Sequence, residues 1–162
     1  MYNNPDIKYL FEPRGVAIIG ASRDKSKIGH KVLENIHISG YQGKLYPVNP
    51  KSAEILGRQA FPSLASIPDT VDVAVVAIPA KGVPQVVREA GEKKIPLVIV
   101  ISSGFREAGE QGKEIEAEIL SIARQYGIRI MGPNCLGLML PHQGINTTFD
   151  PVSPKPGNIA FI

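Results

Sequence analysis

Residues 16–28 read VAIIGASRDKSKI: an apolar run leads to a glycine, a polar and cationic loop follows, and Gly29 comes next. The apolar run predicts a buried strand, and the missing Cβ of Gly20 permits a tight turn at its end. A helix that starts near Gly29 would direct unpaired N–H groups and its positive dipole end toward the loop. A glycine after a strand is also the ordinary way to enter any helix, but Ser22, Lys25 and Lys27 favour a phosphate-binding turn for a nucleotide.

The rest of the chain alternates short apolar runs with helical spacing. Runs typical of strands buried on both faces cover residues 16–19, 45–48, 73–78, 97–101 and 128–131. Apolar residues at helical spacing follow in residues 28–40, 83–90 and 115–127. Such alternation requires right-handed crossovers, so we predict an α/β fold: a Rossmann-like doubly wound parallel sheet with helices on both faces. Residues 51–72 have weak periodicity and predict an irregular connection with room for one short helix.

Composition and charge narrow the class of protein. The chain has 162 residues with 43% hydrophobic content, which suits one soluble domain. Its net charge of +3 includes no long run of like charges, so we expect neither a nucleic-acid nor a membrane partner. The N-terminus lacks the apolar core of a signal peptide, and the single cysteine, Cys135, fits a reducing compartment. A cytoplasmic location is therefore expected.

The ends of the predicted strands indicate the type of nucleotide. An NAD-binding turn has G-x-G-x-x-G and an acidic residue about 20 residues later, and this chain has neither. The second strand instead ends at Asn49 and Lys51, and a lysine there favours a phosphorylated ribose, as in NADP or coenzyme A (CoA). The later strand ends suit the narrow pantetheine arm of CoA better than a flat nicotinamide; they carry Pro79, Ser102, Ser103, Gly104 and Pro133.

Five stretches occur in an order that resembles a known family. They read VAIIGASRDKSKIG, LYPVNPK, VDVAVVAIPA, VIVISSGFREAGEQG and GIRIMGPNCLG. They resemble the N-terminal CoA-binding domain of nucleotide-forming (ADP-forming) acyl-CoA synthetases, in the superfamily of the succinyl-CoA synthetase α subunit. The resemblance predicts a CoA-binding domain over residues 1–140. Residues 141–162 are proline-rich and end in a new apolar run at 159–162, which predicts a linker and the first strand of a following domain.

The resemblance also implies an activity and a set of site residues. Such enzymes interconvert acyl-CoA, ADP and phosphate with a carboxylic acid, CoA and ATP, through an acyl phosphate and a phosphohistidine. ATP or ADP, Mg²⁺ and the phosphohistidine belong to other domains, so this segment alone is expected to bind CoA and not to catalyse. An ATP-grasp domain or subunit and an oligomeric enzyme are implied as well. The implied CoA-binding residues are Gly20, Ser22, Lys25, Lys27, Gly29, Asn49, Lys51, Pro79, Lys81, Ser102, Ser103 and Gly104, with Asn134 in the acyl pocket.

Other readings of the same residues remain open. Cys135-Leu136 after Asn134 departs from succinyl-CoA synthetase, so a monocarboxylic or aromatic acid is favoured over a dicarboxylate. One alternative is a non-catalytic CoA-binding module, such as the synthetase-like region of a protein-lysine acetyltransferase. Another is an NADP-binding oxidoreductase domain.

Several reactive residue types have simpler roles. Cys135 is expected to be a packing residue, because no histidine can be placed beside it as a base. His30, at a helix start, is expected to stay neutral or to contact ligand phosphate. Glu107 lies in the loop at the end of the fourth strand. The helix that follows has four more glutamates, most of which are expected on its solvated face: Glu110, Glu114, Glu116 and Glu118. No cluster has the spacing of a metal site, and no metal is expected.

Overall fold

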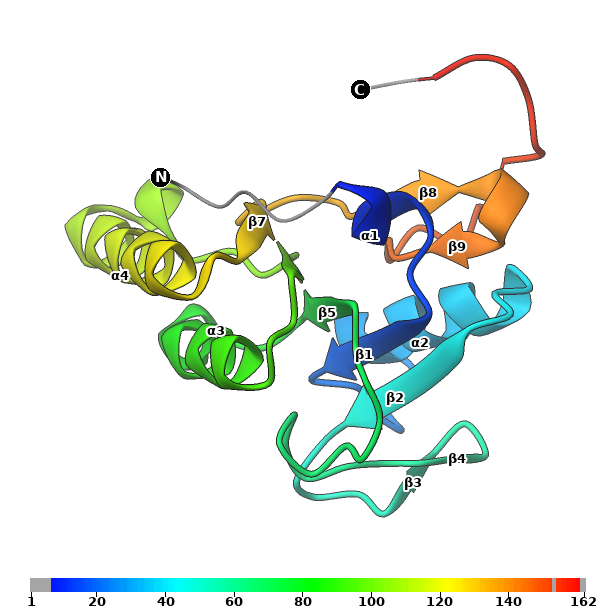
Figure 1. The fold of residues 1–162 in the computed structure, drawn as a ribbon, viewed down its shortest axis with the longest axis horizontal. Coiled ribbons are helices and arrows are strands. Elements are labelled where there is room, and N and C mark those ends of the chain that lie inside the picture. Colours follow the sequence, from blue (N-terminus) through cyan, green and yellow to red (C-terminus); the bar gives the residue numbers. More distant parts are fainter. Residues whose placement is uncertain (1–6, 153, 161–162) are drawn as a thin grey trace.

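The computed structural model describes residues 7–152 and 154–160. At its centre is a five-stranded parallel sheet of order β2-β1-β5-β6-β7 (Figure 1). The helices α2, α3 and α4 connect these strands, which confirms the predicted α/β fold with a parallel sheet. The bounds are β1 Gly15–Ile19, β2 Lys44–Val48, β5 Val73–Val76, β6 Leu97–Val100, β7 Arg129–Met131, α2 Ile28–Ile38, α3 Val83–Glu92 and α4 Glu110–Tyr126.

Helices cover both faces of the sheet because successive strand residues point to opposite sides. In β1, Val16 and Ile18 pack in one apolar cluster with Leu33 of α2. Ala17 and Ile19 pack in a second cluster on the other face, with residues of α3 and α4. Figure 1 shows α3 and α4 side by side across the sheet from α2. All five residues of β1 are buried, as the uninterrupted apolar run predicts.

The strand order determines where a ligand can bind. Along the chain, β2 is added on one side of β1, and the next sheet strand, β5, is added on the other side. The chain therefore changes direction of winding between β1 and β5. In open α/β sheets, ligands bind beyond the carboxyl ends of the strands at such a switch point. The loop after β1, which contains Gly20, lies there.

Shorter elements complete the fold. They are α1 Lys8–Phe11, β3 Glu54–Ile55, β4 Arg58–Gln59, β8 Met139–Leu140, β9 Ile145–Asn146, and 3-10 turns at Ala80–Gly82, Arg106–Ala108 and Pro141–Gln143. The short helix allowed for in residues 51–72 is wrong, because this connection forms the β3–β4 hairpin. Leu56 and Gly57, with φ of 50° and 71°, both adopt the left-handed region that a tight two-residue hairpin turn requires.

The predicted strand boundaries differ from the observed ones by one or two residues, whereas α4 begins at Glu110, five residues before the predicted range. β5 and β6 end at Val76 and Val100, and β7 begins at Arg129. Residues 159 and 160 are not in a strand, and the last two positions of the predicted C-terminal strand lie outside the described residues. The other part of the C-terminal segment does contact the domain: the Asn35 side chain of α2 donates to the carbonyls of Thr148 and Asp150, at 2.8 and 2.7 Å.

One glutamate of the predicted solvated face is buried instead. Glu116 is only 7% exposed, because it shares a helix face with Gly112, Ile119 and Ala123, which are buried. The Arg106 side-chain Nε donates to both of its carboxylate oxygens, at 2.8 and 2.9 Å. These hydrogen bonds lower the pKa of Glu116 below its ordinary value. The pair fastens the loop after β6 to α4.

An ion pair between the exposed side chain of Arg14 and the buried Asp72 joins the start of β1 to the start of β5. Asp72, 2% exposed, accepts hydrogen bonds from the Arg14 backbone N–H at 2.8 Å, from Nε at 3.0 Å and from Nη2 at 2.9 Å. Burial alone would raise the pKa of Asp72, but the hydrogen bonds from Arg14 outweigh it and lower the pKa. The carboxylate therefore contributes stability above its unfolded-state pKa of about 4, and this contribution is lost as the pH falls through the depressed folded-state pKa.

Asp72→Asn is expected to lower the free energy of unfolding by about 2 kcal/mol near neutral pH, because a charge-assisted bidentate pair is lost. Urea unfolding of both proteins over a range of pH measures this. Wild type and variant should become equally stable as the pH falls well below about 4. A difference that persists unchanged in acid would show that the charge of Asp72 is not the source of the effect.

Candidate functional site

The turn after β1 brings two glycines into contact. Gly20 has φ +88°, and an added Cβ there would lie 2.4 Å from the Ala77 carbonyl oxygen beyond β5. At Gly29, in the first turn of α2, an added Cβ would lie 2.0 Å from the Gly20 carbonyl oxygen. The helix start thus packs directly on the backbone of the turn, which only a residue without a side chain allows. Gly20 and Gly29 act as a pair in shaping this turn.

Several N–H groups at this turn have no acceptor within the described residues. They belong to Ser22 and Arg23 in the loop and to Ile28 and Gly29 at the start of α2. The N-cap residue of α2, Lys27, makes no side-chain capping bond. Free N–H groups together with the positive dipole end of an eleven-residue helix are features that favour the binding of an anion. The loop after β1, predicted to bind phosphate, therefore lies beside a helix start that has free N–H groups.

The charged side chains around the turn are exposed. Lys25, Lys27 and Lys51 form no salt bridge within the described part of the chain, so their ammonium groups are available to an anion. Asp24 is the one acidic residue of the loop, and its Oδ1 accepts hydrogen bonds from the backbone N–H and hydroxyl of Ser26, at 2.9 and 2.7 Å. Those bonds lower the pKa of Asp24 and hold its carboxylate on the loop backbone.

Asn49 connects the end of β2 to the turn. Its side-chain Nδ2 donates to the Ala21 carbonyl oxygen at 2.7 Å, and its Oδ1 accepts from the Lys51 backbone N–H at 2.8 Å. The predicted neighbours Asn49 and Lys51 are thus placed beside the phosphate-binding turn, and the asparagine also supports its backbone. Nothing in the sequence around Asn49 indicates this supporting role.

The third and fourth strand ends meet each other. Pro79 precedes the 3-10 turn that contains Lys81, and both side chains are exposed. The Ser102 hydroxyl lies buried, 3.4 Å from the Val76 carbonyl oxygen to which it donates, whereas Ser103 is exposed. An added Cβ at Gly104, φ +101°, would lie 3.2 Å from the Ala80 Cβ. Pro79, Lys81 and Ser103 are therefore exposed side chains of these strand ends that a ligand can reach.

A carboxylate of the protein already occupies part of the fourth strand end. Glu107 accepts hydrogen bonds from the N–H groups of Gly104 and Phe105, at 2.7 and 3.2 Å. These backbone bonds lower the pKa of Glu107 below its ordinary value. The glutamate orders the loop between Ser103 and Arg106, which agrees with its expected place at this edge.

Asn134 also reaches the fourth strand end. Its backbone N–H donates to the Ser102 carbonyl oxygen at 3.0 Å. Asn134 follows the cis Gly132-Pro133 peptide bond, and its own φ is 55°. Cys135 is half-buried and donates from its thiol to the Val100 carbonyl oxygen at 3.4 Å. Burial raises the pKa of this thiol, which disfavours the nucleophilic thiolate and agrees with a packing role. The structure thus gathers the predicted residues from all five strands at one edge of the sheet.

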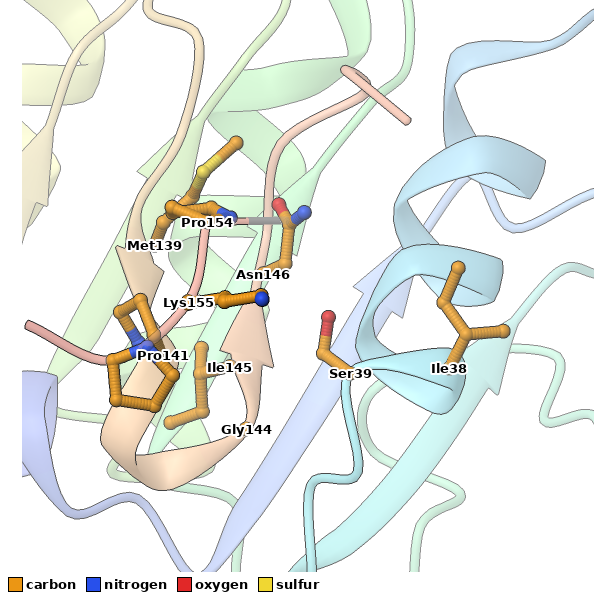
Figure 2. A pocket seen from close by; sticks show the side chains of 10 residues that line it. Ile38, Ser39, Met139, Pro141, Gly144, Ile145, Asn146, Pro154 and Lys155 are labelled. Carbon is orange, nitrogen blue, oxygen red and sulfur yellow. The ribbon is translucent and has the colours of Figure 1, made fainter. Parts of the chain in front are cut away.

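A cavity lies elsewhere in the fold. It has a volume of about 300 Å³ and lies between the C-terminal end of α2 and the β8–β9 hairpin (Figure 2). Figure 2 shows Ile38 and Ser39 on the helix side, with Met139 and Ile145 opposite. Helix rise places this end of α2 about 15 Å from the start of the helix at the phosphate-binding turn. The cavity contains none of the predicted CoA-binding residues.

His30 is the buried titratable residue of the site. It is 2% exposed, and its ring Nδ1 lies 2.8 Å from the Ser22 carbonyl oxygen in the turn. The ring therefore contacts the loop backbone, a partner that the sequence does not indicate. Within the described ranges, no group of three acidic, histidine or cysteine residues is placed to hold a metal ion. No helix there is long and apolar enough to cross a bilayer.

The fold and this edge of the sheet together define a doubly wound nucleotide-binding domain. The chain belongs to the CoA-binding domain family, whose model matches residues 14–141. It is 47% identical to the α subunit of ADP-forming acetate–CoA ligase II of Pyrococcus furiosus, over 96% of this chain and 34% of that protein. It is 36% identical to an ADP-forming 4-hydroxybutyrate–CoA ligase of Nitrosopumilus maritimus, over 94% of this chain and 22% of that protein.

Solved structures agree with this assignment. An acetyl-CoA synthetase of Candidatus Korarchaeum cryptofilum, solved with phosphate and ADP, is 39% identical, with a TM-score of 0.86. That match covers 92% of this chain and 31% of the solved chain. The chain thus corresponds to the α-subunit or N-terminal part of ADP-forming acetyl-CoA synthetases, and it spans about a third of the length of such a subunit.

Proposed function

We propose that this chain binds CoA along the carboxyl edge of its sheet for an ADP-forming acid–CoA ligase. The observation that supports this most directly is the turn at Gly20 and Gly29, where free N–H groups and a helix start face exposed lysines. Family membership selects CoA among the nucleotides that such a turn could hold. The whole enzyme would interconvert acyl-CoA, ADP and phosphate with carboxylic acid, CoA and ATP.

Each part of CoA has a proposed place on this edge. The N–H groups of Ser22 and Gly29, with Lys25 and Lys27, hold the diphosphate, where they neutralise its charge. Lys51, at the end of β2, contacts the phosphate on the adenosine ribose, beside Asn49. The pantetheine arm crosses the third and fourth strand ends, past Pro79, Lys81, Ser102, Ser103 and Gly104.

The acyl group is proposed to lie near Asn134, because this residue is tied to the fourth strand end through Ser102. There Asn134 orients the carbonyl at which the thioester is made or broken. A monocarboxylic acid is the proposed substrate class, and the two ligases named above act on acetate and 4-hydroxybutyrate by their names. Exposed Leu136, two residues after Asn134, adds apolar surface instead of a partner for a second carboxylate.

Other parts of the enzyme would supply the remaining chemistry. ATP or ADP with Mg²⁺ would bind an ATP-grasp domain or subunit, and a histidine outside the CoA-binding domain would carry the phosphoryl group. The similarity to a protein named as an α subunit supports the presence of such a partner. This chain's own share is to bind CoA, to orient its thiol end and to present the thiol to the acyl phosphate, from which phosphate is displaced.

Calorimetric titration of the chain with CoA, dephospho-CoA, NAD and NADP in parallel tests the proposal. CoA should bind with a single site, and neither dinucleotide should bind measurably, because the turn lacks the pattern that dinucleotides use. Binding of NADP without binding of CoA would overturn the proposal in favour of a redox domain. Assay of the chain together with its partner subunit, with CoA, ATP and a monocarboxylic acid, then distinguishes a ligase from a non-catalytic CoA-binding module.

A further inference from the structure

Two loop carbonyls of the phosphate-binding turn are held by side chains from different elements. The Ala21 carbonyl oxygen accepts from Asn49 Nδ2 at 2.7 Å, at the end of β2. The Ser22 carbonyl oxygen lies 2.8 Å from His30 Nδ1, in the first turn of α2. A carbonyl oxygen can only accept a hydrogen bond, so Nδ1 must be the ring nitrogen that carries the hydrogen. These are consecutive peptide groups of the loop.

Holding a carbonyl in place also orients an N–H group. A trans peptide is planar, and its C=O and N–H bonds point in opposite directions. Fixing the Ala21 carbonyl toward Asn49 therefore directs the Ser22 N–H away from Asn49. Fixing the Ser22 carbonyl toward the buried ring of His30 directs the Arg23 N–H away from the ring. These are two of the N–H groups that have no acceptor within the described residues.

The burial of His30 indicates that its contact with Ser22 has a specific role. The residue is 2% exposed, and its Nε2 has no hydrogen-bond partner in the described part of the chain. The carboxylate of Glu34, one helical turn later, is 3.9 Å away, beyond hydrogen-bond distance. An imidazole buried with one nitrogen unpaired is costly, and an apolar side chain would fill the same space more favourably. Among residues 7–152 and 154–160, the bond to Ser22 is thus the one polar contact of the ring at normal distance.

We propose that His30 is a positioning residue for CoA: its Nδ1–H holds the Ser22–Arg23 peptide so that the Arg23 N–H faces the ligand diphosphate. This inference rests on the proposed function. Asn49 does the same for the Ser22 N–H through Ala21. The two ties preorganise the turn, so that CoA binding does not have to order it. His30 itself need not touch the ligand.

Three variants separate this role from simple packing. His30→Leu keeps a buried side chain but removes the donor, and His30→Asn keeps an N–H donor at the reach of Nδ1. Leu33→Ala is the matched control, because Leu33 is fully buried in the same helix and its apolar side chain packs in the core cluster without a hydrogen bond to a loop carbonyl. Calorimetry with CoA and thermal unfolding are measured for each.

His30→Leu should raise the Kd for CoA roughly tenfold, the effect of about one hydrogen bond, and His30→Asn should restore most of the affinity. Leu33→Ala should lower the melting temperature but leave the Kd within about twofold. Ring ¹⁵N shifts of wild type should show a protonated Nδ1 with and without CoA. Wild-type affinity in His30→Leu, or a loss in all three variants that follows their stability, would overturn the inference alone. A wild-type chain that does not bind CoA would overturn the proposed function and this inference with it.

Discussion

Gly29→Ala is expected to abolish measurable CoA binding and to destabilise the chain. The new methyl group would lie 2.0 Å from the Gly20 carbonyl oxygen, 2.6 Å from its carbon and 3.1 Å from the Ala21 nitrogen. All three are backbone atoms, so no side-chain rotation relieves the clash, and the helix start must move away from the turn. Such overpacking costs about 3 kcal/mol of folding free energy. The displaced N–H groups should raise the Kd for CoA more than roughly a hundredfold, measured by calorimetry.

Gly40→Ala is the matched control for this experiment. Gly40 has φ +84°, which strains any other residue, but an added Cβ there meets no atom within 4 Å. It follows the C-terminal end of α2, at the far end of the helix from the phosphate-binding turn. The control should lose about 1 kcal/mol of stability from backbone strain and keep its CoA affinity. A Gly29→Ala variant that binds CoA as tightly as Gly40→Ala would show that the turn is not the phosphate site.

Local sequence patterns predicted those parts of the fold that local forces determine. The apolar run before Gly20 is a strand buried on both faces, and the α4 helix ends before Gly127, whose φ is 68°. The β3–β4 hairpin was not predictable in the same way. Leu56 is a poor candidate for a left-handed conformation by propensity, and its turn forms because Gly57 and the two flanking strands favour it.

Glu116 shows how a local pattern can mislead about burial. Glutamate usually lies in solvent, so a run of glutamates predicts an exposed face. Its position at helical spacing from Gly112 and Ile119 places it on the buried side, and Arg106 makes that burial tolerable. Arg106 is ten residues away in a loop, and a pairing across that distance depends on where the chain folds back. Helical periodicity is enough to place Glu116 on the buried face of the helix, but it does not identify Arg106 as its partner.

The candidate site also has a part that the sequence predicts and a part that it does not. The residues after each strand could be assigned to one edge because parallel strands share the position of their carboxyl ends. The contacts that shape the site could not be assigned, since they join distant elements. Asn49 reaches Ala21 across 28 residues, and Glu107 turns back onto the Gly104 N–H instead of facing a ligand. Which polar groups at this edge are free, and which are already hydrogen-bonded within the protein, therefore depends on the tertiary structure.

Lys51→Ala is expected to weaken CoA binding roughly ten- to thirtyfold while leaving dephospho-CoA within about twofold of wild type. Lys51 is exposed, follows Asn49 at the end of β2, and forms no salt bridge within the described ranges. Only CoA has a phosphate on the adenosine ribose, so the difference between the two ligands isolates that contact from the diphosphate contacts. Because the lysine is exposed, the difference should shrink as salt is added. Parallel calorimetric titrations at low and moderate salt measure both effects.

Lys94→Ala is the matched control for Lys51, because it removes an equal charge from the opposite edge of the sheet. Lys94 is exposed and lies between α3 and the amino end of β6. If general electrostatic attraction accounted for the effect, both variants would weaken CoA and dephospho-CoA alike. If Lys51 instead makes a specific contact with the ribose phosphate, Lys51→Ala should weaken the binding of CoA but not of dephospho-CoA. Lys94→Ala should then leave the affinity for both ligands unchanged. Equal losses for the two ligands in Lys51→Ala would remove this lysine from the ribose-phosphate site and would place its charge near the diphosphate instead.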